Sequence, residues 1–503
     1  QGTHQPMIRT QPSALGLEHR FVLSPLIPNT SYSIRVEGQT PDGREFRSAS
    51  SSIQTVPQGD IPGAPPVPVG LKVVQTAGGP KITWDYQGVD PIVGFRVYRA
   101  EEDAALQLWL DETLLGASTK QTVDELAGGG VRVRYAVEAI DRDQTVSSRT
   151  ADVAFMPAGR LNRDVTWKAA WSPIDLYGDI LVPEGLTFTI QPGVSVRISS
   201  SDAVRGGIDG NRCELLVDGR LVIQAEGLAP VRMLSASALP SRQDWAGIRV
   251  RTSRTALESS EIHNLEVSSA ESGLLVSDTS VNVSGLKSLY CQYGLQIQGA
   301  SGTAISDVSC TDCLTGVQVE STLGCSLTNA KISGGNIGVS LQANRSFTLR
   351  NFEIRGALDT GLIVADTASP TVKGGVIQAV KLGMQVKTAT GDLAFLTIDS
   401  RNGVLIDGGE RPNLINSILV NRLYAGTGNG LEEKISGRSY PYLNVFGFQL
   451  LTVNCNQNGG PVLNIDPQFI GGSPFDYHLN GASQLKSAAN TGGEMVAYGA
   501  PAE

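Results

Sequence analysis

A glycine followed by an aliphatic residue recurs at nearly constant intervals between residues 244 and 423. The spacings between successive glycines are 26, 21, 22, 22, 23, 22 and 20 residues, and the glycines are Gly247, Gly273, Gly294, Gly316, Gly338, Gly361, Gly383 and Gly403. After each glycine, apolar and polar residues alternate with period two, which predicts β-strands. A repeat of this length predicts a solenoid whose units bury their apolar faces against their neighbours. Because helical periodicity and the leucine ladder of leucine-rich repeats are both missing, we expect a right-handed parallel β-helix.

Residues 1–57 have the pattern of the second half of a β-sandwich. The run Leu26-Ile27-Pro28-Asn29-Thr30-Ser31-Tyr32 leads into an alternating strand, and it resembles the tyrosine corner of fibronectin type III domains. A stretch of 57 residues is short for a seven-stranded sandwich. We therefore expect a partial module, completed by chain upstream or by another molecule.

A second sandwich is expected at residues 64–157, after a proline-rich linker at 58–63. Its predicted strands are Leu71–Val73, Ile82–Trp84 with the core tryptophan, Gly94–Arg99 and Tyr135–Ala139. The corner is looser, with glycines at 128–130. These features also resemble fibronectin type III domains, which implies a spacer or interaction module.

The β-helix is expected to span residues 160–492. Its beginning, Val182-Pro183-Glu184-Gly185 and then Gln191-Pro192-Gly193-Val194, and its end, Asp466-Pro467-Gln468-Phe469 and then Asp476-Tyr477-His478-Leu479, resemble bacterial extracellular right-handed β-helix repeat proteins. We expect an N-terminal cap at about 160–200 and a C-terminal cap at 464–492, because end rungs present unpaired backbone. Residues 424–463 break the period and are expected to form a loop excursion, and 493–503 a tail.

Composition narrows the classes of partner. The chain has 503 residues, a formal charge of −9 and no basic run, which argues against nucleic acid and anionic membranes as partners. No apolar run approaches the ~18 residues of a membrane helix. Six cysteines are few for a disulfide scaffold. Cys291 and Cys313 each precede a repeat glycine by three residues, so a ladder of core thiols, a disulfide between adjacent rungs, and a metal or redox site all stay open.

Catalysis on this face would require suitable side chains at the outward positions of the strand after each repeat glycine. They include one glutamate and one aspartate, Glu320 and Asp407, four rungs or ~19 Å apart, whereas glycosidase carboxyl groups stand about 5–9.5 Å apart. We predict no catalytic residue, metal or cofactor there. The same positions form a polar strip that could bond an extended glycan, or whose amides could bond one another: Gln296, Gln298, Gln318, Glu320, Gln342, Gln385 and Lys387.

The leading hypothesis is a secreted or cell-surface structural or adhesion protein, all-β and rod-shaped. Its expected partners are extracellular polysaccharides, other surface proteins or further subunits of an oligomeric assembly. The alternative is a polysaccharide lyase or glycoside hydrolase, because the β-helix fold hosts such enzymes.

Overall fold

The repeat glycines stack into a column. In the computed structural model, a Cβ added to one repeat glycine would lie 2.5–2.7 Å from the carbonyl oxygen of the next, for Gly273, Gly294, Gly316, Gly338, Gly361 and Gly383. The stacked glycines thus allow neighbouring rungs to approach closely, and the column predicted from the sequence is confirmed. The structure describes residues 31–35, 37–39, 44–54, 64–88, 91–251, 259–435, 439–456 and 462–499.

Along most of the chain from residue 159 to 453, the described strands form one 29-stranded parallel sheet that coils into a solenoid. Each complete rung has three faces. The first, the glycine face, contains β12 (Gly159–Arg160), β15 (Ile180–Val182), β18 (Glu214–Val217), β21 (Trp245–Arg251), β23 (Ala270–Ser277), β25 (Tyr293–Gln298), β28 (Thr315–Glu320), β31 (Ile337–Gln342), β33 (Thr360–Ala365), β38 (Thr427–Glu433) and β40 (Phe448–Val453).

Shorter strands make the other two faces. The second face contains β13 (Val165–Trp167), β16 (Thr187–Ile190), β19 (Arg220–Gln224), β26 (Ala304–Ser306), β29 (Ser326–Thr328) and β36 (Asn413–Ile415). The third face contains β14 (Ile174–Leu176), β17 (Ser195–Ile198), β20 (Val231–Ser235), β27 (Ser309–Thr311), β30 (Lys331–Ser333), β37 (Ser417–Val420) and β39 (Leu443–Phe446). Longer strands turn corners: β22 (Ser260–Ser268), β24 (Val281–Leu289) and β32 (Arg345–Ala357) span the second and third faces, and β34 (Ser369–Lys387) and β35 (Asp392–Asp407) span all three.

Residues in the left-handed conformation make the corner between the second and third faces, and most of them are Asn, Asp or Gly. Asp307 and Asn329 occupy equivalent positions on adjacent rungs with φ of 55° and 56°, a left-handed conformation that Asn and Asp tolerate better than most residues. Asn329 Nδ2 donates to Asp307 Oδ1 at 3.1 Å. A stacked pair of this kind turns the chain and links neighbouring rungs at the same time.

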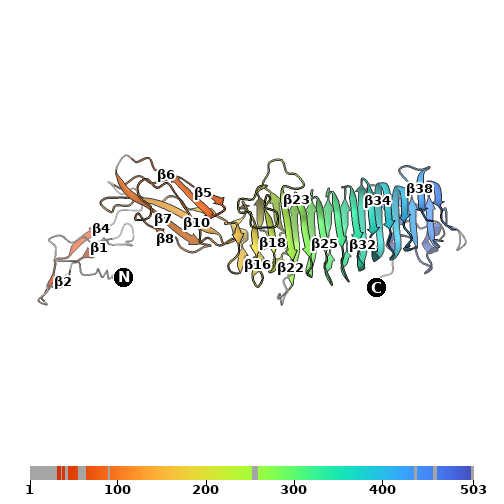
Figure 1. Ribbon diagram of the computed structural model, residues 1–503, viewed down its shortest axis with the longest axis horizontal. Helices are drawn as coiled ribbons and strands as arrows, with labels where there is room; N and C mark the ends of the chain where they lie inside the picture. The colour runs from red at the N-terminus through yellow and green to blue at the C-terminus, as the bar shows by residue number, and fades with distance from the viewer. Residues whose placement is uncertain are drawn as a thin grey trace.

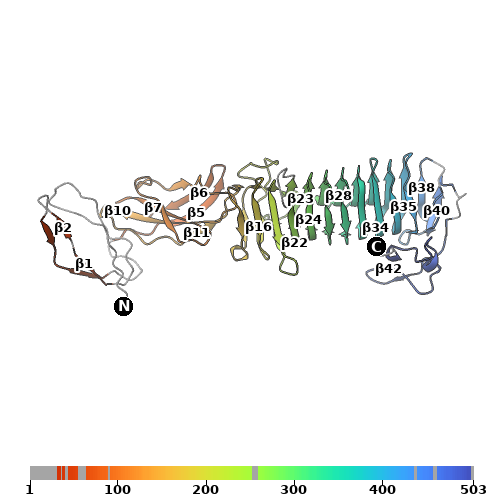
Figure 2. The same ribbon diagram turned by 90° about the horizontal axis from the view of Figure 1, so that it is seen from below.

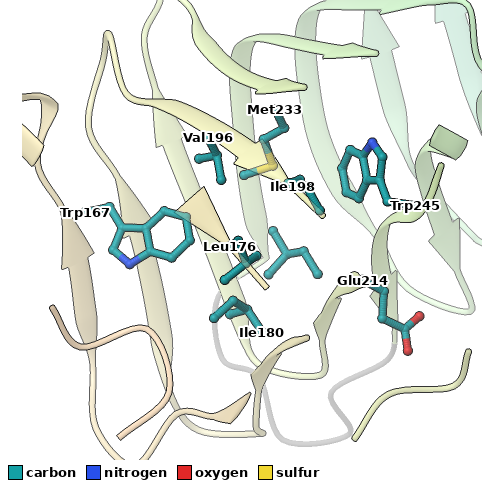
Figure 3. Close-up of a pocket in the computed structure, with 9 residues that line it drawn as sticks. Trp167, Leu176, Ile180, Val196, Ile198, Glu214, Met233 and Trp245 are labelled. Atoms are coloured by element: carbon teal, nitrogen blue, oxygen red, sulfur yellow. The ribbon is translucent and has the colours of Figure 1, made fainter. Parts of the chain in front are cut away.

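The interior of the solenoid is a packed core. Figure 3 shows a cavity inside the first rungs, lined by Trp167, Met233 and Trp245 among others, with the Glu214 carboxylate directed away from it. Its volume is about 10 Å³, close to the minimum that a single water needs. The fold therefore offers its outer faces, and not its interior, to partners.

Within residues 64–88 and 91–157, the strands form two sheets around one core, a sandwich-like arrangement that lies end to end with the solenoid (Figure 1). One sheet has the order β5 (Val69–Thr76), β6 (Gly79–Asp85), β9 (Gln121–Val123), and the other the order β11 (Val153–Phe155), β10 (Val133–Asp141), β7 (Ile92–Glu101), β8 (Gln107–Leu110). Trp84 packs edge-on against Phe95 in its core. The Tyr135 hydroxyl donates to the buried carboxylate of Asp124 at 2.6 Å, so the late-strand tyrosine is anchored by a side chain.

The segment 31–54 pairs β1 (Ser31–Ile34) with β4 (Ser51–Gln54) and β2 (Glu37–Gln39) with β3 (Glu45–Arg47), both antiparallel. None of its described residues is buried. Most of the predicted corner, residues 26–30, and the whole linker at 58–63 lie outside the described residues. The partial module therefore stays a prediction.

The ends of the solenoid differ from the expected caps. Residues 160–200 form strands of the first rungs, and the sandwich residues Val131 and Met156 join the solenoid core there. The range 424–463 contains β38, β39 and β40, so within its described residues the solenoid continues where a loop was expected. The C-terminal segment, with β41 (Phe469–Gly471), β42 (Asp476–Leu479), η2 (Gln484–Ser487) and η3 (Ala497–Gly499), packs on the flank of the last rungs (Figure 2).

Among the described residues there is no helix long and apolar enough to span a bilayer.

Candidate functional site

Parallel register aligns the predicted polar positions of the glycine face in two neighbouring rows. The first row runs Gln296, Gln318, Ser340, Ile363, Gln385, Leu405, and the second runs Gln298, Glu320, Gln342, Ala365, Lys387, Asp407. Adjacent members stand ~4.8 Å apart along the rod. The structure thus places all seven predicted residues, which we call the glutamine strip, on one face.

The strip has two parts. Gln296, Gln298, Gln318, Glu320 and Gln342 occupy three consecutive strands, β25, β28 and β31. The next strand, β33, contributes apolar Ile363 and Ala365 to the two rows. Gln385 and Lys387 follow on β34, beyond that break. A ligand that contacts the whole strip must therefore cross one apolar rung.

Hydrogen bonds connect the amides along the rod. Gln296 Nε2 donates to Gln318 Oε1 at 3.2 Å, and Gln298 Nε2 donates to Glu320 Oε2 at 3.5 Å. Ser272 Oγ in turn donates to Gln296 Oε1. The sequence reasoning missed Ser272 because it precedes its repeat glycine, and a rule based on positions after the glycine cannot find it. These bonds link Ser272, Gln296 and Gln318 along the rod.

Exposure differs along the strip. Gln298 and Lys387 are exposed, and the other five side chains are partly buried. An amide that gives one hydrogen to its neighbour keeps a second donor, and its oxygen has a second lone pair. On each side of the apolar rung, the strip therefore offers donors and acceptors even when its internal bonds are made.

The two acidic residues predicted for the rows lie far apart, although the first row continues from Leu405 to Glu432 on β38, one rung beyond Asp407. Glu320 on β28 and Asp407 on β35 stand four rungs apart, ~19 Å, well beyond the about 5–9.5 Å of glycosidase pairs. Asp407 lies beside Lys387 in the row and 3.5 Å from Lys434 Nζ. In the part of the chain that the structure describes, no cluster of three or more His, Cys, Asp or Glu has the geometry to hold a metal ion.

Three buried carboxylates, those of Asp179, Asp202 and Glu214, lie near the glycine face of the first rungs and accept hydrogen bonds from the loop 199–213. Asp179 accepts from the backbone N–H groups of Gly206, Gly207 and Glu214 at 2.7–2.9 Å. Burial, and after it the contact with Asp202, raises the pKa of Asp179 to about 7. Asp202 Oδ2 is buried without a hydrogen-bond partner among the described residues. This cluster stabilises a loop and is sensitive to pH.

The cysteines near the repeat glycines lie in the solenoid core. Cys291, Cys310 and Cys313 are buried, and their thiols are free in this structure. The hydrogen bond with Cys313, together with burial, raises the pKa of the Cys291 thiol. This arrangement fits the thiol-ladder alternative, in which the three side chains act as small apolar groups.

Several solved structures are similar to this chain. The family 28 exopolygalacturonase of Yersinia enterocolitica is 9% identical, with 79% of this chain and 99% of that chain covered and a TM-score of 0.17. Pectate lyase PelI of Erwinia chrysanthemi is 11% identical, with 75% and 88% covered and a TM-score of 0.16. The FN1–FN3 domains of chicken CNTN1 are 14% identical, with 27% of this chain and 44% of that chain covered and a TM-score of 0.17.

A comparison with curated proteins finds none that matches this chain. A family model does match: the model described as "Right handed beta helix region" aligns with residues 241–377 and with residues 272–432. These residues contain the glycine column and the strands β21 to β38 of the parallel solenoid. The chain is therefore an all-β protein built around a right-handed parallel β-helix.

Proposed function

We propose that this protein is a secreted or cell-surface structural or adhesion protein whose β-helix presents the glutamine strip to an extended glycan or to a partner protein. The observation that carries the proposal is the register-locked pair of polar rows on one continuous sheet. An extended polymer that lies along β25, β28 and β31 meets donors and acceptors every ~4.8 Å, and it meets them again at β34 beyond the apolar rung.

The junction with the sandwich supports a rod that acts as one body. Trp167 Nε1 of the first rung donates to Gly130 O of the sandwich at 2.8 Å, and the backbone N–H of Ala158 donates to Gln75 Oε1 at 2.9 Å. The two modules also share a core at Val131 and Met156. A rigid connection of this kind holds the strip at a fixed distance from whatever the N-terminal part is attached to.

A glycan-array screen tests the proposal, comparing the unchanged protein with a Gln298→Ala/Glu320→Ala double variant. Gln224→Ala is the matched control, because Gln224 is also an exposed glutamine that bonds a glutamate, Glu261, but lies on the second face. We expect binding to fall by about tenfold or more in the double variant, which corresponds to about 1.4 kcal/mol, and to persist in the control. Equal binding by all three proteins would refute the role of the strip.

The enzyme alternative makes a different prediction. A polysaccharide lyase or glycoside hydrolase would release reducing ends or unsaturated products from uronate or neutral polysaccharides. Such turnover would be lost on Glu320→Gln or Lys387→Ala if the strip were the active site. Turnover with that mutational pattern would replace the structural proposal.

Size measurement of native material tests the assembly form of the proposal, in which the rod is one subunit of a larger complex.

A further inference from the structure

A cleft lies where the sandwich meets the first rungs, remote from the glutamine strip. Its volume is about 280 Å³, and both modules line it: Arg132 and Phe155 come from the sandwich, and Trp171, Asp175 and Tyr177 from the solenoid. This volume is near the lower end of small-molecule sites, about 300–1,000 Å³, which are frequent at domain interfaces. It suits one ring-sized group and not a long chain.

Aromatic rings form part of the lining. Tyr177 stacks on Phe155 with ring centroids 6.3 Å apart and planes within 4° of parallel. Tyr177 is 44% exposed, so its ring is accessible from solvent, whereas Phe155 is buried behind it. Trp171 belongs to the short helix η1 (Ala169–Trp171), is partly buried, and donates from Nε1 to Asp103 Oδ1 at 3.3 Å. Flat apolar faces of this kind pack against ring-shaped ligands at little cost in side-chain entropy.

Charged groups complete the cleft. The Arg132 guanidinium lies 5.6 Å from the Trp171 ring centroid and donates from Nη1 to the backbone oxygen of Glu102 at 3.3 Å. Asp175 accepts from Arg197 Nε at 2.6 Å and Nη2 at 2.7 Å. A guanidinium has five N–H donors and a carboxylate about four acceptor positions. Both groups therefore keep capacity for further hydrogen bonds toward a ligand.

The cleft is preformed by contacts between the modules. Lys168 Nζ pairs with Asp103 Oδ2 at 2.8 Å, and Arg163 Nη2 pairs with Glu101 Oε2 at 2.9 Å. Together with the bond between Trp167 and Gly130, these contacts fix the two walls relative to one another. The free-energy cost of ordering the site when a ligand binds is therefore small.

We propose that this junction cleft binds a pyranose ring at the end or a branch of an oligosaccharide. A pyranose has an apolar C–H face that stacks on the Tyr177 and Trp171 rings, and an edge of hydroxyl groups that bond Arg132 and Asp175. Donors, acceptors and aromatic faces occur here together, whereas the glutamine strip has amides without aromatic rings. The proposal does not depend on the strip and would hold if the strip bound nothing.

Saturation-transfer NMR on the full chain tests the cleft, with methyl glucoside, methyl galactoside, methyl mannoside and methyl glucuronide as probes. We expect ring protons of at least one probe to receive saturation. Tyr177→Ala should weaken the binding of that probe by up to about tenfold, the upper value for loss of an aromatic contact. Tyr177→Phe retains the ring and should retain most of the binding. Tyr424→Ala, which removes another exposed tyrosine near the far end of the rod, is the control.

Three results would overturn the proposal: no saturation of any pyranoside, equal binding by Tyr177→Ala and the unchanged protein, or binding of the glucuronide alone that added salt abolishes. The last result would indicate a simple anion at Arg132. Circular dichroism of each variant confirms that the fold is retained, and Asp175→Asn gives a second variant on the polar side of the cleft, with weaker binding expected.

Discussion

The glycine column gives a quantitative prediction for Gly338→Ala. A Cβ at this position would lie 2.5 Å from the carbonyl oxygen of Gly361 on the next rung and 2.5 Å from Ile354 Cγ2 across the core. The carbonyl belongs to a strand bonded on both sides and cannot move away without breaking the ladder. Overpacking costs about 1–3 kcal/mol, and a rigid backbone partner places this case near the upper value.

The cost converts into a shift of the melting temperature. Unfolding entropy is about 2.1 cal/mol/K per residue, so the roughly 340 residues from β12 to the C-terminal segment contribute about 0.7 kcal/mol/K if they unfold together. A loss of about 3 kcal/mol then lowers the midpoint by about 4 °C. Circular dichroism at one fixed scan rate measures this shift, because the midpoint of a large protein depends on the rate.

Gly409→Ala is the matched control. Gly409 follows the same kind of strand, but a Cβ there would meet nothing within 4 Å and its backbone is not in the left-handed region. The control should melt within about 1 °C of the unchanged protein or slightly above it, since alanine restricts the unfolded chain. If Gly338→Ala melts with the control, close approach of the rungs is not the reason for the repeat glycine.

Three further predictions concern buried polar groups. Because the pKa of Asp179 is raised to about 7 in the folded chain, the proton it binds stabilises the fold at low pH, and this stability is lost as pH rises from about 4 to about 7. Asp202→Asn, which supplies a donor to Asp179, should make the free energy of unfolding in urea less dependent on pH. An unchanged pH dependence would contradict the role of Asp202. Tyr477→Phe removes the bond to Asp399 Oδ2 at 2.7 Å and should cost about 1.5–3 kcal/mol, seen as faster proteolysis of the C-terminal segment than in Tyr498→Phe. The buried thiols of Cys291 and Cys313 should react with a maleimide only after unfolding without reductant, and failure to react then would show a disulfide.

The sequence predicts the solenoid well because its signals are local. Period-two alternation around a repeat glycine determines which side chains face outward, and the parallel register aligns these positions on successive rungs. Gln298, Glu320 and Gln342 therefore fall in one row as expected. The glycine column even extends past the last predicted repeat. Gly403 approaches the carbonyl of Gly430, but the 27-residue spacing between them exceeds the preceding intervals and conceals the next rung.

The parts that escape prediction depend on contacts between distant segments. The junction cleft combines Arg132 of the sandwich with Trp171 and Tyr177 of the first rungs, and the sequence gives no sign that these residues meet. The bond between Ser272 and Gln296 likewise depends on how adjacent rungs align. Local periodicity specifies a face, whereas the relative position of two modules and the side-chain pairing within a face are set by packing.

The flank position of the C-terminal segment follows from a change along the third face. Its outward residues are charged on the earlier rungs, as at Lys331 and Glu353, and become uncharged on the later rungs, at Val376, Thr397 and Ile418. Loss of the charges makes burial of this row favourable, and the segment covers it with alternating inward residues, among them Tyr477.

One buried charge fixes where that segment docks. Asp399 lies within the covered face, between Gln378 and Val420 of the adjacent rungs, and is 2% exposed, so it requires partners. Arg422 Nη2 lies 2.7 Å from its carboxylate, and the Tyr477 hydroxyl donates to the same oxygen. The Arg422 guanidinium also lies 3.3 Å from the ring centroid of Phe475. A shift of one rung would leave the ion pair between Asp399 and Arg422 in place but would remove the Tyr477 hydroxyl and the Phe475 ring from it. These two contacts therefore select the register that the apolar contacts alone leave open.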